Sequence, residues 1–192
     1  MKLILTRHGE TVENVKMIFQ GQSHGKLTDK GIEQAKKLAL RFKDDKIDAI
    51  YSSDLQRAID TAKEILKYHP NLKLNLDKRL RERDLGALTG KPIKSLVIDW
   101  NTAPEDVEKD PEMLFRAKAF LDEVYSKHKN ELIMVICHGA IKTAILGILS
   151  GKNEFDNDLF DKLSNASVSI IDIEEDNKHK VHVIGCTKHL EK

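Results

Sequence analysis

The chain opens with Met1-Lys2-Leu3-Ile4-Leu5-Thr6-Arg7-His8-Gly9-Glu10-Thr11, a short apolar run that ends in an arginine and a histidine. The apolar part has the length of a buried strand, and it is shorter than the roughly 7–15 apolar residues of a secretion signal. Open α/β sheets bind ligands at the carboxyl ends of their strands. We therefore expect a first strand over Lys2–Thr6 with a polar site directly after it.

Further runs of strand length follow, with helical patterns between most of them. Strands are expected at Lys2–Thr6, Ile47–Ser52, Lys73–Leu76, Leu132–Cys137, Val168–Ile173 and Val181–Gly185, and helices at Gly31–Phe42, Leu55–Tyr68, Pro111–Lys129 and Ala140–Leu149. The alternation of the two patterns predicts an α/β fold.

Length and composition suggest one domain over residues 1–192, because the chain is long enough for one sizeable core and short for two. The irregular segment 86–110, with its glycines and prolines, reads as an excursion that covers the substrate. A net charge of +1 gives no reason to expect a nucleic acid or an acidic membrane as partner, and no apolar run reaches the ~20 residues of a membrane span. Two cysteines make no disulfide framework, which favours the cytoplasm.

Polar side chains recur where the predicted strands end. They are Arg7-His8-Gly9-Glu10, Ser52-Ser53-Asp54 with Arg57, Arg81-Glu82, and His138-Gly139. Because the carboxyl ends of parallel strands meet at one edge of a sheet, these segments are expected to converge on one pocket. The pocket would hold two histidines, two or more arginines and a carboxylate.

This set of side chains suits phosphoryl transfer. Guanidinium groups bind phosphate oxygens in a bidentate way, and a neutral imidazole between them can attack phosphorus. Nearby cations disfavour the imidazolium form, so His8 is expected to stay neutral and nucleophilic. Glu82 could give a proton to the leaving group, and His138 with the first amides of the helix after Gly139 could bind the developing charge.

The sequence resembles the histidine phosphatase superfamily, also called phosphoglycerate mutase-like proteins. The matching motifs are Leu5-Thr6-Arg7-His8-Gly9-Glu10-Thr11 with Asn14, Gln20-Gly21, Leu27-Thr28-Asp29-Lys30-Gly31-Ile32-Glu33-Gln34-Ala35, Ser52-Ser53-Asp54-Leu55-Gln56-Arg57-Ala58 with Thr61-Ala62, Leu80-Arg81-Glu82, His138-Gly139 and Asn165-Ala166-Ser167. Their order and spacing cover nearly the whole chain.

The resemblance implies a role for each matching position. His8 would be the phosphorylated nucleophile, Glu82 the proton donor, and Arg7, Arg57 and His138 the phosphate pocket. It also implies that Asn14, Gln20, Gly21 and Gly139 lie near the substrate or its phosphate. The implied fold is a three-layer α/β/α sandwich around a mixed, mainly parallel sheet, and the implied chemistry needs neither metal nor cofactor.

Several residues have a plainer interpretation. Asp84 competes with Glu82 for the role of acid, although Glu82 is favoured. Cys137 should face away from His138 on its strand and is expected to be a buried structural residue. His179, His182 and His189 lack the spacing of a metal site and are expected at the surface.

Three functions remain open at this point. The first is a phosphatase acting on a small phosphorylated metabolite such as a sugar phosphate or alpha-ribazole phosphate. The second is a phosphoglycerate mutase dependent on 2,3-bisphosphoglycerate, and the third is a phosphate-binding protein without catalysis. The segment Leu85-Gly86-Ala87-Leu88-Thr89-Gly90 departs from the mutases, as do Glu13 and Lys26 from many relatives. The sequence is also compatible with a homodimer.

Overall fold

The computed structural model describes residues 1–93, 103–175 and 178–191, and these form a layered fold around one sheet. The strands are β1 (Lys2–Arg7), β2 (Ala49–Ser52), β3 (Leu74–Leu76), β4 (Leu132–Cys137), β5 (Val168–Asp172) and β6 (Lys180–Cys186). Their order in the sheet is β3-β2-β4-β1-β5-β6. The β1–β4, β2–β4 and β2–β3 pairs are parallel, whereas β1–β5 and β5–β6 are antiparallel.

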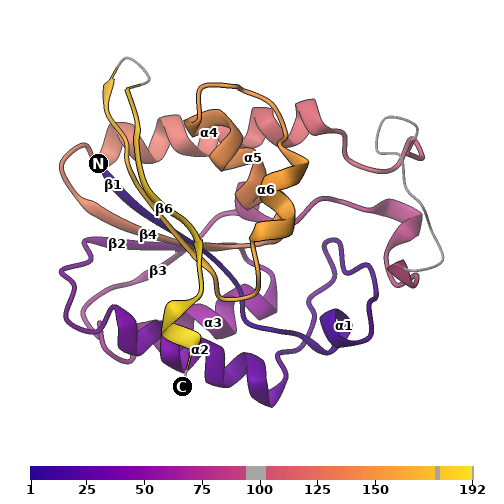
Figure 1. The fold of residues 1–192 in the computed structure, drawn as a ribbon, viewed down its shortest axis with the longest axis horizontal. Coiled ribbons are helices and arrows are strands. Elements are labelled where there is room, and N and C mark those ends of the chain that lie inside the picture. Colours follow the sequence, from indigo (N-terminus) through magenta and orange to yellow (C-terminus); the bar gives the residue numbers. More distant parts are fainter. Residues whose placement is uncertain (94–102, 176–177, 192) are drawn as a thin grey trace.

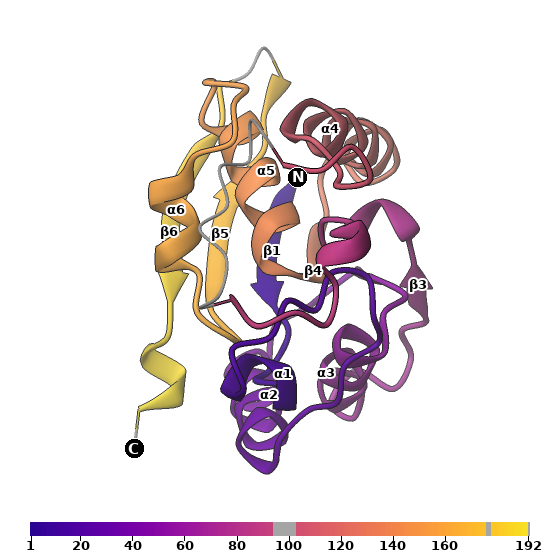
Figure 2. The same cartoon turned by 90° about the vertical axis from the view of Figure 1, so that its right-hand side faces the viewer.

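Helices cover both faces of this sheet. The helices α2 (Asp29–Arg41) and α3 (Gln56–Leu66) lie on one face, and α4 (Asp110–Lys127) and α5 (Gly139–Leu149) lie on the other (Figures 1 and 2). The helices α2, α3 and α4 are crossovers between parallel strands, whereas α5 leads from β4 to the antiparallel strand β5. The expected three-layer α/β/α sandwich with a mixed, mainly parallel sheet is confirmed.

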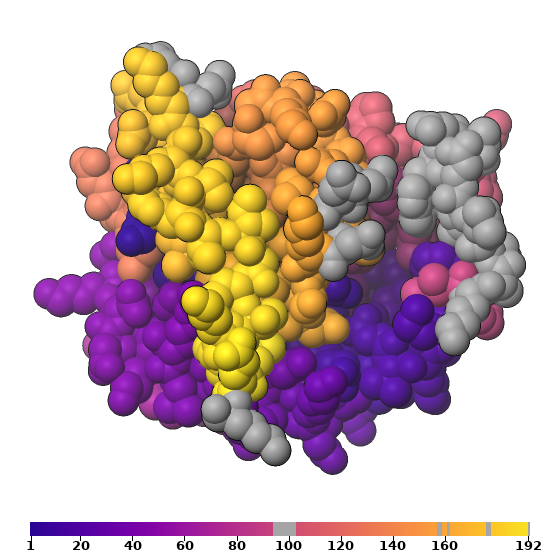
Figure 3. Space-filling view, viewed as in Figure 1, coloured from indigo at the N-terminus to yellow at the C-terminus, as the bar shows by residue number. Residues whose placement is uncertain are grey.

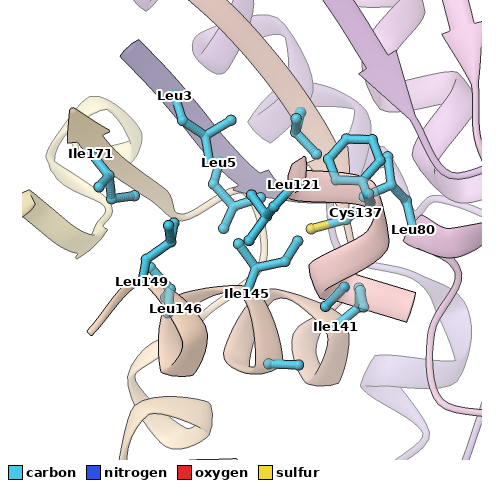
Figure 4. Packing of buried hydrophobic residues seen from close by; sticks show 14 of the residues in the cluster. Leu3, Leu5, Leu80, Leu121, Cys137, Ile141, Ile145, Leu146, Leu149 and Ile171 are labelled. Atoms are coloured by element: carbon cyan, nitrogen blue, oxygen red, sulfur yellow. The ribbon is translucent and has the colours of Figure 1, made fainter. Parts of the chain in front are cut away.

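The core is split by the sheet into two clusters. Leu3 and Leu5 of β1 pack toward α5, where Ile141 and Ile145 meet them (Figure 4). Ile4, between them in sequence, points to the opposite face and packs with the side chains of α2 and α3. The alternation follows from the two-residue period of a strand, so the central strand is buried on both sides.

The two short helices were not predicted, and several boundaries shift by one or two residues. α1 (Val12–Val15) begins at a capping box in which Thr11 Oγ1 accepts the backbone N–H of Asn14. α6 (Asn157–Lys162) follows the loop after α5. The helix predicted from Gly31 begins at Asp29, because Thr28 Oγ1 accepts the N–H of Gly31 across 2.9 Å and caps it.

Of the predicted excursion over residues 86–110, the structure describes residues 86–93 and 103–110. Leu85 and Leu88, at a short 3₁₀ turn, bury a small apolar cluster with Val107, and Phe19 packs against it. Lys94, Trp100 and Asn101 of this segment lie outside the described residues. Among the residues that are described, no helix is long and apolar enough to cross a membrane.

Candidate active site

His8 and His138 each follow one of the two central parallel strands. Arg7 of β1 lies in register with Cys137 of β4, and the His8 N–H donates to the Cys137 carbonyl across 3.0 Å. The register therefore brings the two histidines together, with ring centroids 5.1 Å apart, and both side chains are buried. The expected convergence of these strand ends is present.

Hydrogen bonds to the His8 ring define its tautomer. Nδ1 lies 2.7 Å from the carbonyl oxygen of Gly9, which can only accept, so Nδ1 carries the proton. Nε2 lies 3.2 Å from Nε of Arg57, which can only donate, so Nε2 carries the lone pair. The geometry thus presents Nε2 as a neutral, nucleophilic nitrogen.

Burial is the main reason that His8 stays neutral. It holds the pKa of His8 well below its usual value, and the neighbouring charges of Arg57 and Arg7 lower this pKa further. The pKa of His138 is lowered for the same reasons, with burial again the largest cause. The arginines were expected to have this effect, but desolvation contributes more than they do.

Arg57 is buried in the first turn of α3, where it also organises a loop. Its Nη2 donates to the Gly21 carbonyl across 2.9 Å, and its Nη1 donates to the carbonyls of Ser23 and His24. Burial lowers the pKa of Arg57 to about 10, so the guanidinium remains charged at neutral pH. One cation therefore touches the nucleophile and fixes the loop that carries Gly21.

Other buried polar atoms near His8 have no partner among the described residues. Nη1 of Arg7 donates to the Leu163 carbonyl across 2.8 Å, but Nε of Arg7 makes no hydrogen bond. Both ring nitrogens of His138 are also without a partner in the described part of the chain. Because unpaired buried polar groups cost free energy, these atoms favour a polar ligand between them.

Glu82 is held at the first turn of α5. Its Oε1 accepts the backbone N–H of Ala140 across 3.0 Å and that of Arg83 across 2.9 Å. Asp84, the competing acid, instead accepts the N–H of Gly86 and is exposed. The first amides of α5 were expected to face a phosphate, but that of Ala140, the second residue of the helix, binds the Glu82 carboxylate. Glu82 lines the cavity and Asp84 does not, which favours Glu82 as the acid.

The substrate-side positions predicted from the sequence divide into two groups. Asn14, Gln20 and Gly21 line the same cavity as His8. Gly139 and His138 are not among the residues that line it, whereas the next residue, Ala140, is. A Cβ atom built on Gly139 would lie 2.9 Å from Cε2 of Phe160, so a larger residue there would require the Phe160 ring to shift. Arg81 does not line the cavity, because it pairs with Asp54 across 2.6 Å.

Asn165 links the two loops behind the nucleophile, a function that the sequence did not reveal. Its Nδ2 lies 3.2 Å from the His8 carbonyl and 3.1 Å from Oδ1 of Asn14. The same Asn14 oxygen accepts the backbone N–H of Thr11 across 3.1 Å. The motif Asn165-Ala166-Ser167 was the available signal, but its spacing alone gives no geometry.

Lys142 is a buried cation that sequence reasoning also missed, because it occurs within the apolar helix pattern of α5. Its Nζ donates to the Ser167 carbonyl across 2.7 Å and to Ser167 Oγ across 3.1 Å. The same carbonyl accepts the backbone N–H of Arg7. Burial lowers the pKa of Lys142 to about 7. Lys142 thus ties α5 to the backbone beside Arg7.

These residues surround a cavity of about 340 Å³. Its floor is polar and consists of Arg7, His8, Asn14, Gln20, Gly21, Arg57 and Glu82. Its walls are formed by Ile18, Phe19, Arg83, Leu85, Ile93, Ala140, Phe155 and Phe160. In the space-filling view the surface is hollowed between the orange segment around α6 and the indigo N-terminal segment (Figure 3).

The remaining candidate residues lie outside this cavity. Cys137 is buried in the core cluster that includes α5, and burial raises its pKa to about 12, in agreement with a structural role. His182 is exposed, as expected, whereas His179 and His189 are half-buried, and Nδ1 of His189 lies 3.0 Å from Nη1 of Arg41. In the described residues, no three His, Cys, Asp or Glu side chains are grouped to hold a metal ion.

Comparison with known proteins identifies one family. The family described as histidine phosphatase superfamily (branch 1) matches residues 3–184. Phosphoserine phosphatase 1 of Hydrogenobacter thermophilus is 33% identical over 210 residues, covering 99% of this chain and 94% of that protein. Phosphoglycerate mutase-like protein 4 of Arabidopsis thaliana is 31% identical over 204 residues, covering 99% and 87%.

The fold has close counterparts among solved structures. YhfR of Bacillus stearothermophilus superposes with a TM-score of 0.88 at 27% identity, and the match covers 99% of each chain. The agreement therefore extends over the sheet, both helical layers and the segments that carry the candidate site.

Proposed function

This chain belongs to the histidine phosphatase superfamily, and from that premise we propose that it hydrolyses small phosphomonoesters through a phosphohistidine on Nε2 of His8. The observation that carries the proposal is the ring geometry of His8. Gly9 fixes the proton on Nδ1, and Arg57 points at the lone pair of Nε2. The nucleophilic nitrogen therefore faces the cavity in its neutral form.

In the first step, Nε2 attacks phosphorus in line with the ester oxygen. The P–N bond forms as the P–O bond to the alcohol breaks, and protonated Glu82 gives its proton to the leaving alkoxide. Arg7 and Arg57 bind the non-bridging oxygens, and an N–H of His138 donates a further hydrogen bond. Throughout, Nδ1–H stays bonded to Gly9 and supports the positive charge on the ring.

In the second step, water replaces the alcohol. Glu82, now a carboxylate, takes a proton from this water as its oxygen attacks phosphorus. The P–N bond breaks, its electron pair returns to Nε2, and inorganic phosphate leaves. The cycle restores neutral His8 and protonated Glu82, so atoms and charge balance without another reactant.

The relatives indicate only the class of the substrate. Relatives named phosphoserine phosphatase support a small phosphorylated metabolite as the substrate. A mutase would use the same phosphohistidine but return the phosphoryl group to a hydroxyl of a retained glycerate. The difference lies in which nucleophile reaches the phosphohistidine.

The test is phosphate release from a generic aryl phosphate in the presence of excess chelator. The wild type should release phosphate and His8→Ala should lose at least about 10³-fold in kcat. His182→Ala, which removes an exposed histidine of β6, is the matched control and should retain activity. Activity that survives in His8→Ala would overturn the proposal.

A second measurement separates hydrolysis from mutation. The enzyme is given 3-phosphoglycerate with 2,3-bisphosphoglycerate, and both phosphate and 2-phosphoglycerate are followed. Phosphate release without interconversion supports the phosphatase. Interconversion that is faster than phosphate release would assign the chain to the mutases instead.

A further inference from the structure

The walls of the cavity differ in chemistry from its floor. Phe155 lies in the loop after α5, and Phe160 lies in α6. Ile18 and Ile93 contribute further apolar surface to the same cavity. The part of the cavity beyond the phosphate is therefore largely apolar and includes two aromatic rings.

Phe160 is the more accessible of these rings. Its side chain is 38% exposed and belongs to neither main core cluster. A Cβ atom built on Gly139 would lie 2.9 Å from the Phe160 ring and 3.6 Å from Cζ of Arg7, so the ring borders the phosphate floor directly. An exposed aromatic ring that fills no core position is available for contact with a ligand.

Among the described residues that line the cavity, the cations are Arg7, Arg57 and Arg83. The first two lie on the floor beside His8. Arg83 is 4% exposed, pairs with Asp110 across 2.5 Å and donates to the Glu108 carbonyl across 2.8 Å. Its guanidinium also lies over the ring of Phe155, 5.0 Å from the centroid. Arg83 thus joins the Phe155 loop to the start of α4.

Resting on the proposed function, we infer that this cavity selects phosphomonoesters whose alcohol part is a compact apolar or aromatic group and disfavours those with a carboxylate beside the phosphate. An aromatic alcohol part of the substrate would contact Phe155 and Phe160. A carboxylate in this part of the cavity would be desolvated against apolar walls, and Arg83, the cation among the wall residues, already pairs with Asp110. The volume of about 340 Å³ lies at the lower end of ligand pockets, which suits a body of one or two rings.

The test compares esters with similar leaving groups, so that differences in kcat/KM reflect how the cavity binds the alcohol part of each substrate. 2-Phenylethyl phosphate, ethyl phosphate and phosphoserine are all esters of primary alcohols. We expect kcat/KM for 2-phenylethyl phosphate to exceed that for phosphoserine at least tenfold. A preference for phosphoserine with intact dependence on His8 would overturn this inference and leave the proposed function standing, whereas no His8-dependent release from any ester would overturn the proposed function.

Two variants test the wall itself. Phe160→Ala should lower the ratio of kcat/KM between 2-phenylethyl and ethyl phosphate by roughly tenfold. Phe160→Lys should also raise the relative rate for phosphoserine, because it adds a cation beside the body of the substrate. Phe115→Ala, which removes a 78% exposed phenylalanine of α4, is the matched control and should leave the ratio unchanged. An unchanged ratio in both Phe160 variants would contradict the assignment.

Discussion

Arg57 donates its Nε–H to Nε2 of His8 across 3.2 Å. This contact occupies the lone pair of the proposed nucleophile until a phosphate arrives, and it opposes protonation at the same atom. When phosphorus bonds to Nε2, the Arg57 donor can pass to a phosphoryl oxygen. One guanidinium would therefore keep the resting histidine neutral and stabilise the transferred group.

The first prediction concerns this contact. Arg57→Gln should raise the pKa of His8 toward its ordinary value, because it removes the nearest positive charge. Loss of the phosphate contact should lower kcat/KM by about 10²–10³-fold. NMR titration of labelled histidine measures the pKa directly. An unchanged His8 pKa would show that burial alone keeps it neutral.

The second prediction concerns the proton donor. Glu82→Gln keeps acceptors for the amides of Ala140 and Arg83 but cannot donate an acidic proton. The variant should lose about 10²–10³-fold in rate on alkyl phosphates and much less on p-nitrophenyl phosphate, whose leaving group needs no proton. Asp84→Asn provides the control. Equal losses on both esters would assign the acid to another residue.

The third prediction concerns Asn165, which acts through its neighbours and is a positioning residue. Asn165→Ala removes the bonds to the His8 carbonyl and to Asn14. It should lower kcat by roughly tenfold with little change in KM, because phosphate binding is retained while the nucleophile is displaced. Asn75→Ala removes a comparable amide bond, to the Ile50 carbonyl at the sheet edge, and should leave kcat intact. If both variants lose kcat equally, the effect is general loss of stability.

The fourth prediction concerns stability and Lys142. Its pKa falls to about 7 in the folded chain, whereas the unfolded chain keeps this proton to about pH 10.4. Above pH 7 the unfolded state therefore binds more protons, and the free energy of unfolding should rise with pH by at most about 1.4 kcal/mol per unit. Urea unfolding between pH 7 and 8.5 measures this slope.

Lys142→Met supplies the comparison for that slope. The variant lacks the titrating lysine, so its free energy of unfolding should rise less steeply with pH, and the slope that remains near pH 7 comes from the buried histidines His8 and His138. The range stops at pH 8.5 because Cys137, whose pKa is raised to about 12, acts in the opposite direction above the ordinary thiol pKa. Identical slopes in wild type and variant would contradict a buried, titrating Lys142.

Sequence patterns predicted the regular elements well, because each one carries a clear period. Leu3, Ile4 and Leu5 alternate between the two faces of the sheet, and Ala35, Leu38 and Ala39 lie on the buried side of α2. The short helices α1 and α6 escaped prediction, since four to six residues carry too little periodicity. α1 depends on the local capping box of Thr11 and Asn14.

The candidate site could be predicted in its residue types but not in its contacts. Arg7, His8, Arg57 and Glu82 do meet at one cavity. The sequence could not show that Arg57 also binds the loop at Gly21, since that contact depends on tertiary packing. Phe160 gave no signal either, because its segment approaches the cavity only through the path of the chain after α5.

The sheet order also has a consequence for the growing chain. β4 is inserted between β1 and β2, although it follows both in the sequence. A nascent chain that ends before β4 carries His8, Arg57 and Glu82 but lacks the strand that brings His138 beside His8. Enzymatic activity should therefore appear only after β4 and His138 have been synthesised. If the gene were split ahead of β4, recovered turnover would report the docking of the two fragments.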